Sequence, residues 1–509
     1  MDKNRTMLPT ETPPSGSADS AVFTRRQLLQ VAGSAGLLAG VSRAAYAQHE
    51  GHDMSSMPGM KMPAAEPATA IKPAAGLEPP SSLKRHPQGY LPVRTLNGWT
   101  LPYEMKGGVK EFHLVAEEIE HEFAPGSRGK CWGYNGTTPG PTIEVVEGDR
   151  VRILVTNRLG ESTSVHWHGI DLPNGYDGVG GLNQPHIQPG ETFAYEFTLK
   201  QHGSHMYHPH ADEMTQMAFG MMGLFIIHPK AGEEVKIDRD YCFLLHNWAM
   251  HPGTYRPDPS IMQDFDLWTF NSKTFPAIEN LVMRTGERAR IRIANLSMWN
   301  HPVHLHSNPF WVTGSDGGRW PRSQWPRETT VIVGVGQIRD IEFVATEPGD
   351  WAFHCHMAHH TMGPMGHGVP NPTGVDQTGV DAEIRQMLPG FAAMGKYGMS
   401  EHGGHVAMGL AGPENTLPMM TGEGLYGPIE MGGMFTVVKV RDQQKAGDFT
   451  DPGWYQNPKD KIAKKVSGDP DFGNPPRRQP YGPSSTPAAT PKMPPMESMP
   501  GMNHSKHGG

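Results

Sequence analysis

The chain has 509 residues, and 52 Asp and Glu against 44 Lys and Arg give it a formal net charge of -8, which does not favour nucleic-acid binding. Only three Cys occur, which excludes a disulfide scaffold, and 61 Gly with 48 Pro favour short strands joined by turns over helices. The 31 Met and 27 His are ligands for soft and borderline metals, so the composition indicates a metalloprotein.

Residues 1–47 have the pattern of a twin-arginine export signal. Arg25 and Arg26 precede an apolar stretch rich in Gly and Ala, and residues 45–47 (Ala-Tyr-Ala) form a small-x-small cleavage site. The apolar stretch is too short to anchor in a bilayer, and no other segment approaches 18 uninterrupted apolar residues. We therefore expect a periplasmic protein without a membrane span.

Two segments rich in Met and Pro, residues 48–84 and 456–509, lack hydrophobic periodicity and are expected to be disordered. Some of their Met recur at every third residue, which an extended Pro-rich helix would place on one edge. These are Met54, Met57, Met60, Met493, Met496, Met499 and Met502. Because thioethers select Cu(I), we interpret them as accessory Cu(I) ligands; the alternative is a neutral low-complexity tail.

The region between these segments is dense in strand signals bounded by turn residues, as at 142–146, 151–155 and 435–438. It also contains an internal repeat, in which Asn157 aligns with Asn295 at an offset of 138 residues. The sequence therefore predicts an all-β fold with two tandem β-sandwich domains, over residues 85–230 and 231–455.

Four His-x-His pairs occupy equivalent places in the two copies of the repeat. They are His166/His168 and His208/His210 in the first copy, and His304/His306 and His354/His356 in the second. Residues two apart on a strand point to the same face, so each pair presents two imidazoles together. Eight imidazoles exceed the needs of one zinc site and indicate a cluster of several metal ions.

Cys355 lies between His354 and His356 and therefore points to the opposite face of the strand. With His301, His360 and Met365 it completes the two imidazoles, thiolate and thioether of a blue-copper electron-transfer site. The equivalent residues in the first copy are Thr163, Pro209, Met214 and Phe219. We therefore predict one mononuclear site, in the second domain, with electrons passing from Cys355 through the adjacent peptide to its two neighbouring His.

The quoted motifs resemble those of the multicopper oxidases over about residues 85–440. The resemblance implies cupredoxin-like Greek-key domains, a type 1 copper that accepts substrate electrons, and a type 2/type 3 cluster that reduces O2 to water. By position, type 1 copper takes His301, Cys355, His360 and Met365; type 2 takes His166 and His304; type 3 takes His168, His208, His210, His306, His354 and His356. Four copper ions per chain are therefore expected.

Asp177 matches an acidic residue that assists proton delivery in this family, whereas Thr361 stands where many bacterial relatives carry a second acidic residue. The sequence therefore does not identify the second proton donor. The sequence leaves no room for a complete middle domain and resembles two-domain members, which place the cluster between neighbouring subunits. We expect a head-to-tail homotrimer.

An insertion rich in Gly, Met and His, residues 366–433, follows the type 1 ligands and is expected to cover the face where electrons enter. Met365 as an axial ligand should lower the copper potential. Together with the Met-rich insertion, this favours an oxidase of the copper-resistance type that acts on Cu(I). The main alternative is a laccase-like oxidase of phenols, Mn(II) or Fe(II). A copper nitrite reductase and a non-enzymatic copper store fit the eight imidazoles less well.

Cys131 and Cys242 either pair or stay buried thiols, and His246 is interpreted as an ordinary histidine.

Overall fold

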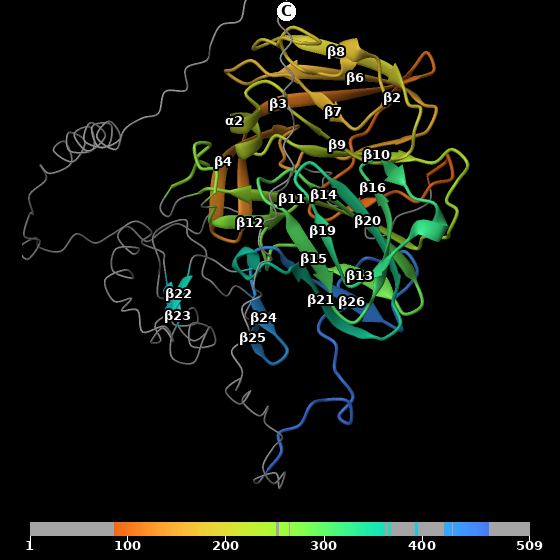
Figure 1. Cartoon of the computed structure of the whole chain (residues 1–509), viewed down its shortest axis with the longest axis vertical. Helices are drawn as coiled ribbons and strands as arrows, with labels where there is room; N and C mark the ends of the chain where they lie inside the picture. The colour runs from red at the N-terminus through yellow and green to blue at the C-terminus, as the bar shows by residue number, and fades with distance from the viewer. Residues whose placement is uncertain are drawn as a thin grey trace, which may run out of the picture. The chain divides into compact units, whose positions relative to one another are not determined.

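The computed structural model describes residues 86–250, 254–263, 265–361, 422–429 and 431–467, and the backbone alone at 365–367 and 392–394. The export signal, the Met of both terminal segments and most of the insertion lie outside the described residues. The described part is almost entirely β-structure (Figure 1). The predicted all-β fold with two tandem cupredoxin-like sandwiches is confirmed.

The first sandwich pairs a five-stranded sheet with a four-stranded sheet. The five-stranded sheet contains β2 (Glu104–Lys106), β3 (Val109–Ala124), β4 (Ser127–Tyr134), β6 (Arg150–Asn157) and β8 (Thr192–Thr198). The four-stranded sheet has the order β5 (Ile143–Val146), β10 (Gly223–His228), β9 (Gly203–His208) and β7 (His166–His168). Its edge strand β7 and its neighbour β9 carry three of the predicted metal-ligating His.

The second sandwich pairs an eight-stranded sheet with a five-stranded sheet. The larger sheet contains β1 (Arg94–Thr95), β11 (Arg239–Trp248), β12 (Leu267–Phe270), β14 (Arg288–Asn295), β16 (Phe310–Ser315), β17 (Gly318–Arg319), β18 (Arg327–Glu328) and β20 (Ile338–Val344). The smaller sheet has the order β13 (Leu281–Arg284), β26 (Phe435–Arg441), β21 (Gly349–Cys355), β15 (His301–Leu305) and β19 (Thr330–Val333). Although β1 lies early in the chain, it pairs with β11 and so extends a sheet of the second sandwich.

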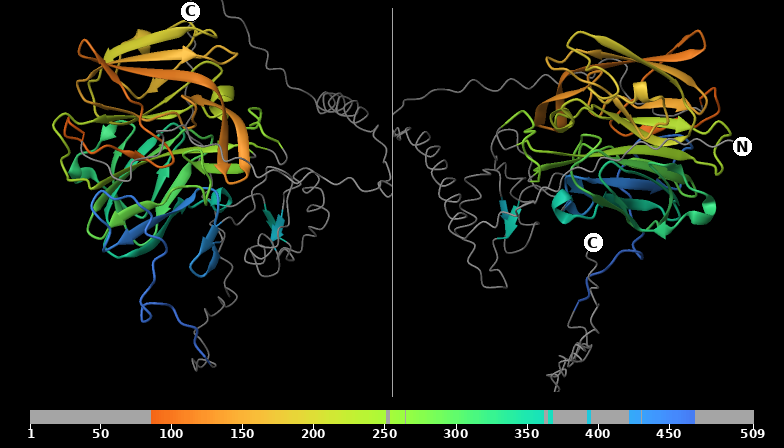
Figure 2. Two further views of the ribbon diagram at one scale, coloured as in Figure 1. Left: turned by 180° about the vertical axis from the view of Figure 1, so that it is seen from behind. Right: turned by 45° about the horizontal axis from the view of Figure 1, so that its top comes forward.

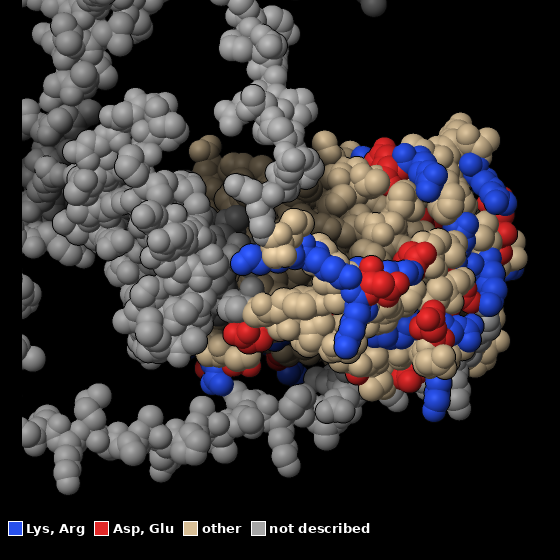
Figure 3. All heavy atoms as spheres, turned by 90° about the horizontal axis from the view of Figure 1, so that it is seen from below, with Lys and Arg blue, Asp and Glu red and all other residues tan. Residues whose placement is uncertain are grey.

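The short elements lie in the connections between these strands. They are α2 (Glu213–Ala218), η1 (Asn174–Tyr176), η2 (Arg322–Gln324), η3 (Ala358–Thr361), and the strand pairs β22 (Met365–His367) with β23 (Ala392–Met394) and β24 (Gly422–Gly424) with β25 (Gly427–Ile429). None of the described helices has the length and apolar character needed to cross a bilayer. On the face in Figure 3, basic and acidic side chains are interspersed.

The two sandwiches repeat one pattern of strand pairing, which explains the sequence repeat. In the first, β6 runs parallel to β3 and antiparallel to β8; in the second, β14 runs parallel to β11 and antiparallel to β20. In the facing sheets, β9 lies between β7 and β10 as β21 lies between β15 and β26. The four His-x-His pairs therefore start from equivalent strands.

A continuous apolar layer joins the two sandwiches, whose strands are seen from two further sides in Figure 2. Side chains alternate on β10, so Phe225 points into the core of the first sandwich while Leu224 points into the joining layer. On β11, Phe243 points into the second core and Leu244 into the same joining layer. Both strands are consequently buried along their whole length, which is typical of strands covered on both faces.

A buried ionic network crosses this joining layer beside the apolar contacts. The guanidinium of Arg292 on β14 donates two hydrogen bonds of 2.8 Å to the carboxylate of Asp240, and a third of 2.8 Å to the hydroxyl of Ser204 on β9. That hydroxyl donates in turn to Asp340 on β20 at 2.8 Å. Because each buried polar group must find a defined partner, the network fixes how β9 sits on the second sandwich.

Candidate metal centres

The central strand β21 brings two kinds of predicted ligand to one place. In its pairing with β15, Cys355 lies opposite Val303 and His354 lies opposite His304. The Cys355 N–H donates to the Met434 carbonyl at 3.0 Å, and the His356 N–H donates to the Pro302 carbonyl at 2.6 Å. These backbone bonds on both sides fix the direction of each ligand side chain.

Cys355, His301 and His360 converge in the interior of the second sandwich. The Cys355 Sγ lies 3.6 Å from His301 Nδ1 and 3.3 Å from His360 Nδ1, and the two Nδ1 atoms are 3.1 Å apart. All three side chains are buried. One thiol and two imidazole nitrogens that share a dry site form the equatorial donor set of a blue-copper centre.

Two further residues orient these imidazoles. The Ser297 hydroxyl lies 2.7 Å from His301 Nε2, so the second nitrogen of that ring has a partner. The His360 ring stacks on the indole of Trp268, with centroids 3.6 Å apart and an interplanar angle of 20°. Both rings are thereby held with Nδ1 toward the sulfur.

The protonation of this site suits a metal ion. Burial lowers the pKa of His301 to about 3 and that of His360 to about 2, so both imidazoles are neutral near pH 7 and keep a lone pair. Burial raises the pKa of the Cys355 thiol to about 12. A bound cation would supply the charge that stabilises the thiolate, so metal binding would release a proton.

The fourth predicted type 1 ligand, Met365, begins β22, and its side chain lies outside the described residues. The backbone just before it is well anchored. The Gly432 N–H donates to the Thr361 carbonyl at 2.7 Å, and the Met434 N–H donates to the His360 carbonyl at 3.0 Å. These bonds fix His360 independently of the residues between 361 and 432.

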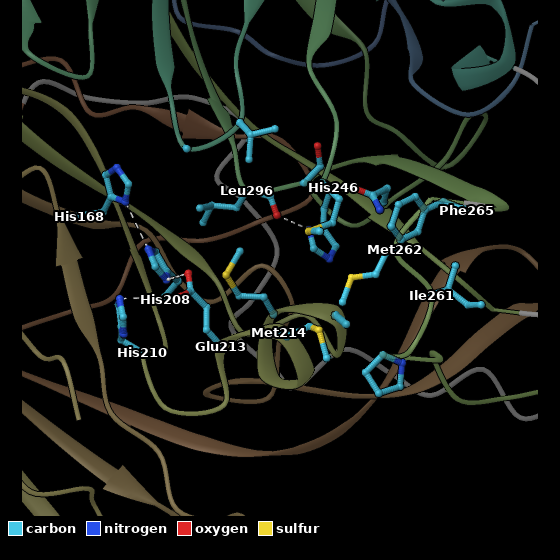
Figure 4. A pocket seen from close by; sticks show the side chains of 18 of the residues that line it. His168, His208, His210, Glu213, Met214, His246, Ile261, Met262, Phe265 and Leu296 are labelled. Atoms are coloured by element: carbon cyan, nitrogen blue, oxygen red, sulfur yellow. Dashed lines mark hydrogen bonds and ion pairs between the residues drawn. The ribbon is translucent and has the colours of Figure 1, made fainter. Parts of the chain in front are cut away.

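The first sandwich gathers His166, His168, His208 and His210, here called the first quartet, at one end of a pocket (Figure 4). The His166 ring lies with its centroid 5.4 to 5.7 Å from those of the other three. His168 Nδ1 and His208 Nε2 are 3.3 Å apart. Three of the four, His166, His168 and His208, direct nitrogens toward a space small enough for one metal ion.

The second sandwich gathers His304, His306, His354 and His356, here called the second quartet. The His304 centroid lies 4.8 to 5.6 Å from those of the other three rings, and His306 Nε2 is 3.2 Å from His354 Nε2. His354 is buried, whereas His306 and His356 are exposed. The second quartet therefore presents part of its nitrogen set to the outside of the described chain.

Backbone carbonyls fix the tautomer of four quartet imidazoles. The Nδ1 atoms of His166, His208, His304 and His354 lie 2.7, 2.9, 2.7 and 2.7 Å from the carbonyl oxygens of Asp177, Pro209, Thr329 and Cys355. A carbonyl only accepts, so each Nδ1 carries the hydrogen and each Nε2 keeps its lone pair for a metal. The His354 bond also links this imidazole to the peptide of Cys355.

Two acidic residues adjoin the first quartet. A carboxylate oxygen of Asp177 lies 3.5 Å from His166 Nδ1. Glu213, at the start of α2, lies 3.5 Å from His208 and 3.8 Å from His210. Glu213 was not among the predicted site residues, although its position three residues after His210, at the start of a helix, was a usable signal.

The two quartets do not meet within the described part of the chain. Every ring contact between quartet imidazoles there joins members of the same quartet. A cluster that uses all eight imidazoles would therefore need the first quartet of one chain and the second quartet of another.

Cys131 and Cys242 are free, buried thiols that both belong to the layer joining the sandwiches. Burial raises the pKa of each thiol well above its ordinary range. They therefore behave as small apolar side chains, the second of the two alternatives left open by the sequence.

Comparison with known proteins identifies the family from which these motifs come. Two multicopper oxidase family models match residues 116–232 and 252–374. Copper resistance protein A of Escherichia coli is 35% identical over 184 residues, or 36% of this chain and 29% of that protein. Its namesake in Pseudomonas syringae pv. tomato is 35% identical over 204 residues, or 39% and 31%. The matches thus span less than a third of these relatives.

Another curated protein and a solved structure resemble the chain as well. Laccase-2 of Botryotinia fuckeliana is 38% identical over 154 residues, or 30% of this chain and 24% of that protein. The blue copper oxidase of Nitrosomonas europaea is 23% identical, with a TM-score of 0.49 over 68% of this chain and 96% of that one.

His205, which sequence analysis also missed, gives a pH-dependent prediction. Burial, followed by the positive charges of His168 and Arg292, lowers its pKa to about 4. Below pH about 6.5 the unfolded chain binds a proton at this residue that the folded chain does not. This group should therefore lower the free energy of unfolding by about 1.4 kcal/mol per pH unit between pH 6.5 and 4.

Replacing His205 with Leu should remove this contribution and make the stability of the metal-free protein less dependent on pH. Urea unfolding at several pH values measures it, and the difference between the variant and wild type should be constant above pH 7. An unchanged slope below pH 6.5 would contradict the assignment.

Proposed function

Because this chain belongs to the multicopper oxidase family, we propose that it couples one-electron oxidation of a small substrate to the four-electron reduction of O2 to water. His301, Cys355, His360 and Met365 would hold the type 1 copper, and the two quartets would hold type 2 and type 3 copper. Bound copper would supply the redox chemistry. The residues of the chain position the metals, exclude water and handle protons.

The observation that carries the proposal is the arrangement around Cys355. Its sulfur faces His301 and His360 within 3.6 Å, while its carbonyl accepts a hydrogen bond from His354 Nδ1 at 2.7 Å. The two candidate centres are thus joined by a single residue and one hydrogen bond. Such a short path suits a reaction in which single electrons arrive at one site and four electrons are consumed together at the other.

Protons for O2 reduction would come from the acidic residues beside the first quartet. Asp177 contacts His166 through its carbonyl and lies near it through its carboxylate. Glu213 lies beside His208 and His210 and is a candidate for the second proton donor that Thr361 does not supply.

Cu(I) is the substrate that best fits the whole chain. The Met spacing of the terminal segments and the Met-rich insertion both favour a soft cation, and two relatives bear the name copper resistance protein A. Periplasmic location by the twin-arginine route belongs to the same proposal. A laccase-like oxidation of phenols, Mn(II) or Fe(II) is the second candidate, and one relative bears the name Laccase-2.

A head-to-tail homotrimer would complete the cluster. The first quartet lines an open pocket, and the second quartet contains the exposed His306 and His356. If each first quartet faces the second quartet of the next chain, a closed ring of three would make three complete sites.

Replacing Cys355 with Ser tests the electron path. We expect the loss of one copper per chain, the loss of the intense red-end visible absorption of copper thiolate, and oxygen uptake at the background rate. The matched control is Cys131→Ala, which removes a buried thiol outside the predicted ligand sets and should keep all three properties. Unchanged colour and oxygen uptake in Cys355→Ser would refute the assignment.

Mixing two inactive variants tests the shared cluster. His210→Ala disables the first quartet and His356→Ala the second. When the two variants are co-expressed in equal amounts, about one quarter of the sites in random trimers should combine an intact first quartet with an intact second quartet. Oxygen uptake should recover to about that fraction of wild type. An intact mixed trimer without activity, or a fully active monomer by light scattering, would overturn the proposal.

Shortening the insertion tests the substrate. Residues 369–420 should be replaced by a short Gly/Ser linker, leaving Gly432 and Gly433, which are bonded to Thr361 and Phe275, in place. If thioether contacts contribute about 1.4 kcal/mol to the transition state, kcat/KM for Cu(I) should fall about tenfold. Phenol oxidation should be retained. Equal loss of both activities with copper content unchanged would count against a selective role.

A further inference from the structure

A pocket of about 630 Å³ extends from the first quartet toward the second sandwich. His168, His208 and His210 occupy one side of the view in Figure 4, while His246, Met262 and Phe265 occupy the other, with Met214 between. Most of the lining surface is apolar, yet it includes several sulfur atoms and an imidazole that the proposed reaction does not use.

His246 lies on β11 and is 3% exposed. Its Nδ1 is 2.6 Å from the Leu296 carbonyl oxygen, so Nδ1 carries the hydrogen and Nε2 carries the lone pair. Nε2 makes no hydrogen bond of normal geometry with the described residues, although the backbone of Met217 lies beside the ring. Burial lowers the pKa of His246 to about 4, so the ring is neutral and this lone pair is available near pH 7.

Four thioethers line the same pocket. Met214 and Met217 lie three residues apart on α2 and thus share a face of that helix. Met262 and Met298 come from loops of the second sandwich. Met214, Met262 and Met298 are 48%, 42% and 52% exposed, so they are not serving to fill a core.

We propose that this pocket binds one Cu(I) ion through His246 Nε2 and two or more of the thioethers of Met214, Met217, Met262 and Met298. Thioether sulfur and neutral imidazole form a soft donor set that selects Cu(I) over Zn²⁺ and other harder cations. The ion would be additional to the type 1 and cluster coppers. It would lie beside the first quartet, in the same cavity, where it can supply copper to that quartet.

The test uses the full-length protein, fully loaded with copper and reduced without oxygen, and titrated with further Cu(I) against a chromophoric Cu(I) chelator. The variant Met214→Leu/Met262→Leu/Met298→Leu keeps side-chain volume and apolar character. It should retain about one Cu(I) per chain less than wild type, or bind that ion at least tenfold more weakly. The terminal Met segments are present in wild type and in every variant. Any Cu(I) that they bind is therefore the same in each protein compared.

The matched control is Met105→Leu on β2, which is 59% exposed and does not line the pocket; it should match wild type. His246→Leu should show the same loss as the triple variant, and the X-ray absorption of the copper added to wild type should include one nitrogen scatterer. If the triple variant binds as much Cu(I) as Met105→Leu, the site does not exist. Equally tight binding of Zn²⁺ by wild type would also overturn it.

Discussion

The alternation of side chains along β21 is the constraint on which both candidate centres depend. Because neighbours on a strand point to opposite faces, the thiol of Cys355 enters the core with Val303 and Phe353, while His354 joins the second quartet. The strand is hydrogen-bonded to β15 on one side and β26 on the other. A shift of one residue in either register would exchange the two faces. The pairing register of β21 therefore decides which side chains reach each candidate centre.

The joining layer likewise fixes the position of metal ligands, here by holding one sandwich against the other. Its apolar part buries both faces of β10 and β11, and its polar part ties Arg292 and Asp340 to Ser204 on β9. Strand β9 ends at His208 of the first quartet. The position of that quartet on the second sandwich is therefore set by buried contacts between sheets. A long loop or a flexible hinge would not hold metal ligands as firmly.

Much of this arrangement could be predicted from the sequence because it is local. The offset of 138 residues that aligned Asn157 with Asn295 also relates the bounds of β6 to those of β14, and period-two spacing separated Cys355 from its His neighbours. Contacts between distant segments gave no such signal: Glu213 beside His208, the burial of His205, and the nitrogen of His246 that makes no normal hydrogen bond. The separation of the two quartets was expected only through family resemblance, since spacing in one chain says nothing about a second chain.

The residues where the insertion leaves and re-enters the sandwich are direct hydrogen-bond partners: the Gly432 N–H binds the Thr361 carbonyl. The intervening chain is thus a closed loop on a fixed base, and the entropy cost of closing it rises only with the logarithm of its length. Evolution can lengthen, shorten or replace this intervening segment without moving His360. Apart from Met365, the predicted axial ligand within this segment, the choice of electron donor can therefore change without altering Cys355, His301 and His360.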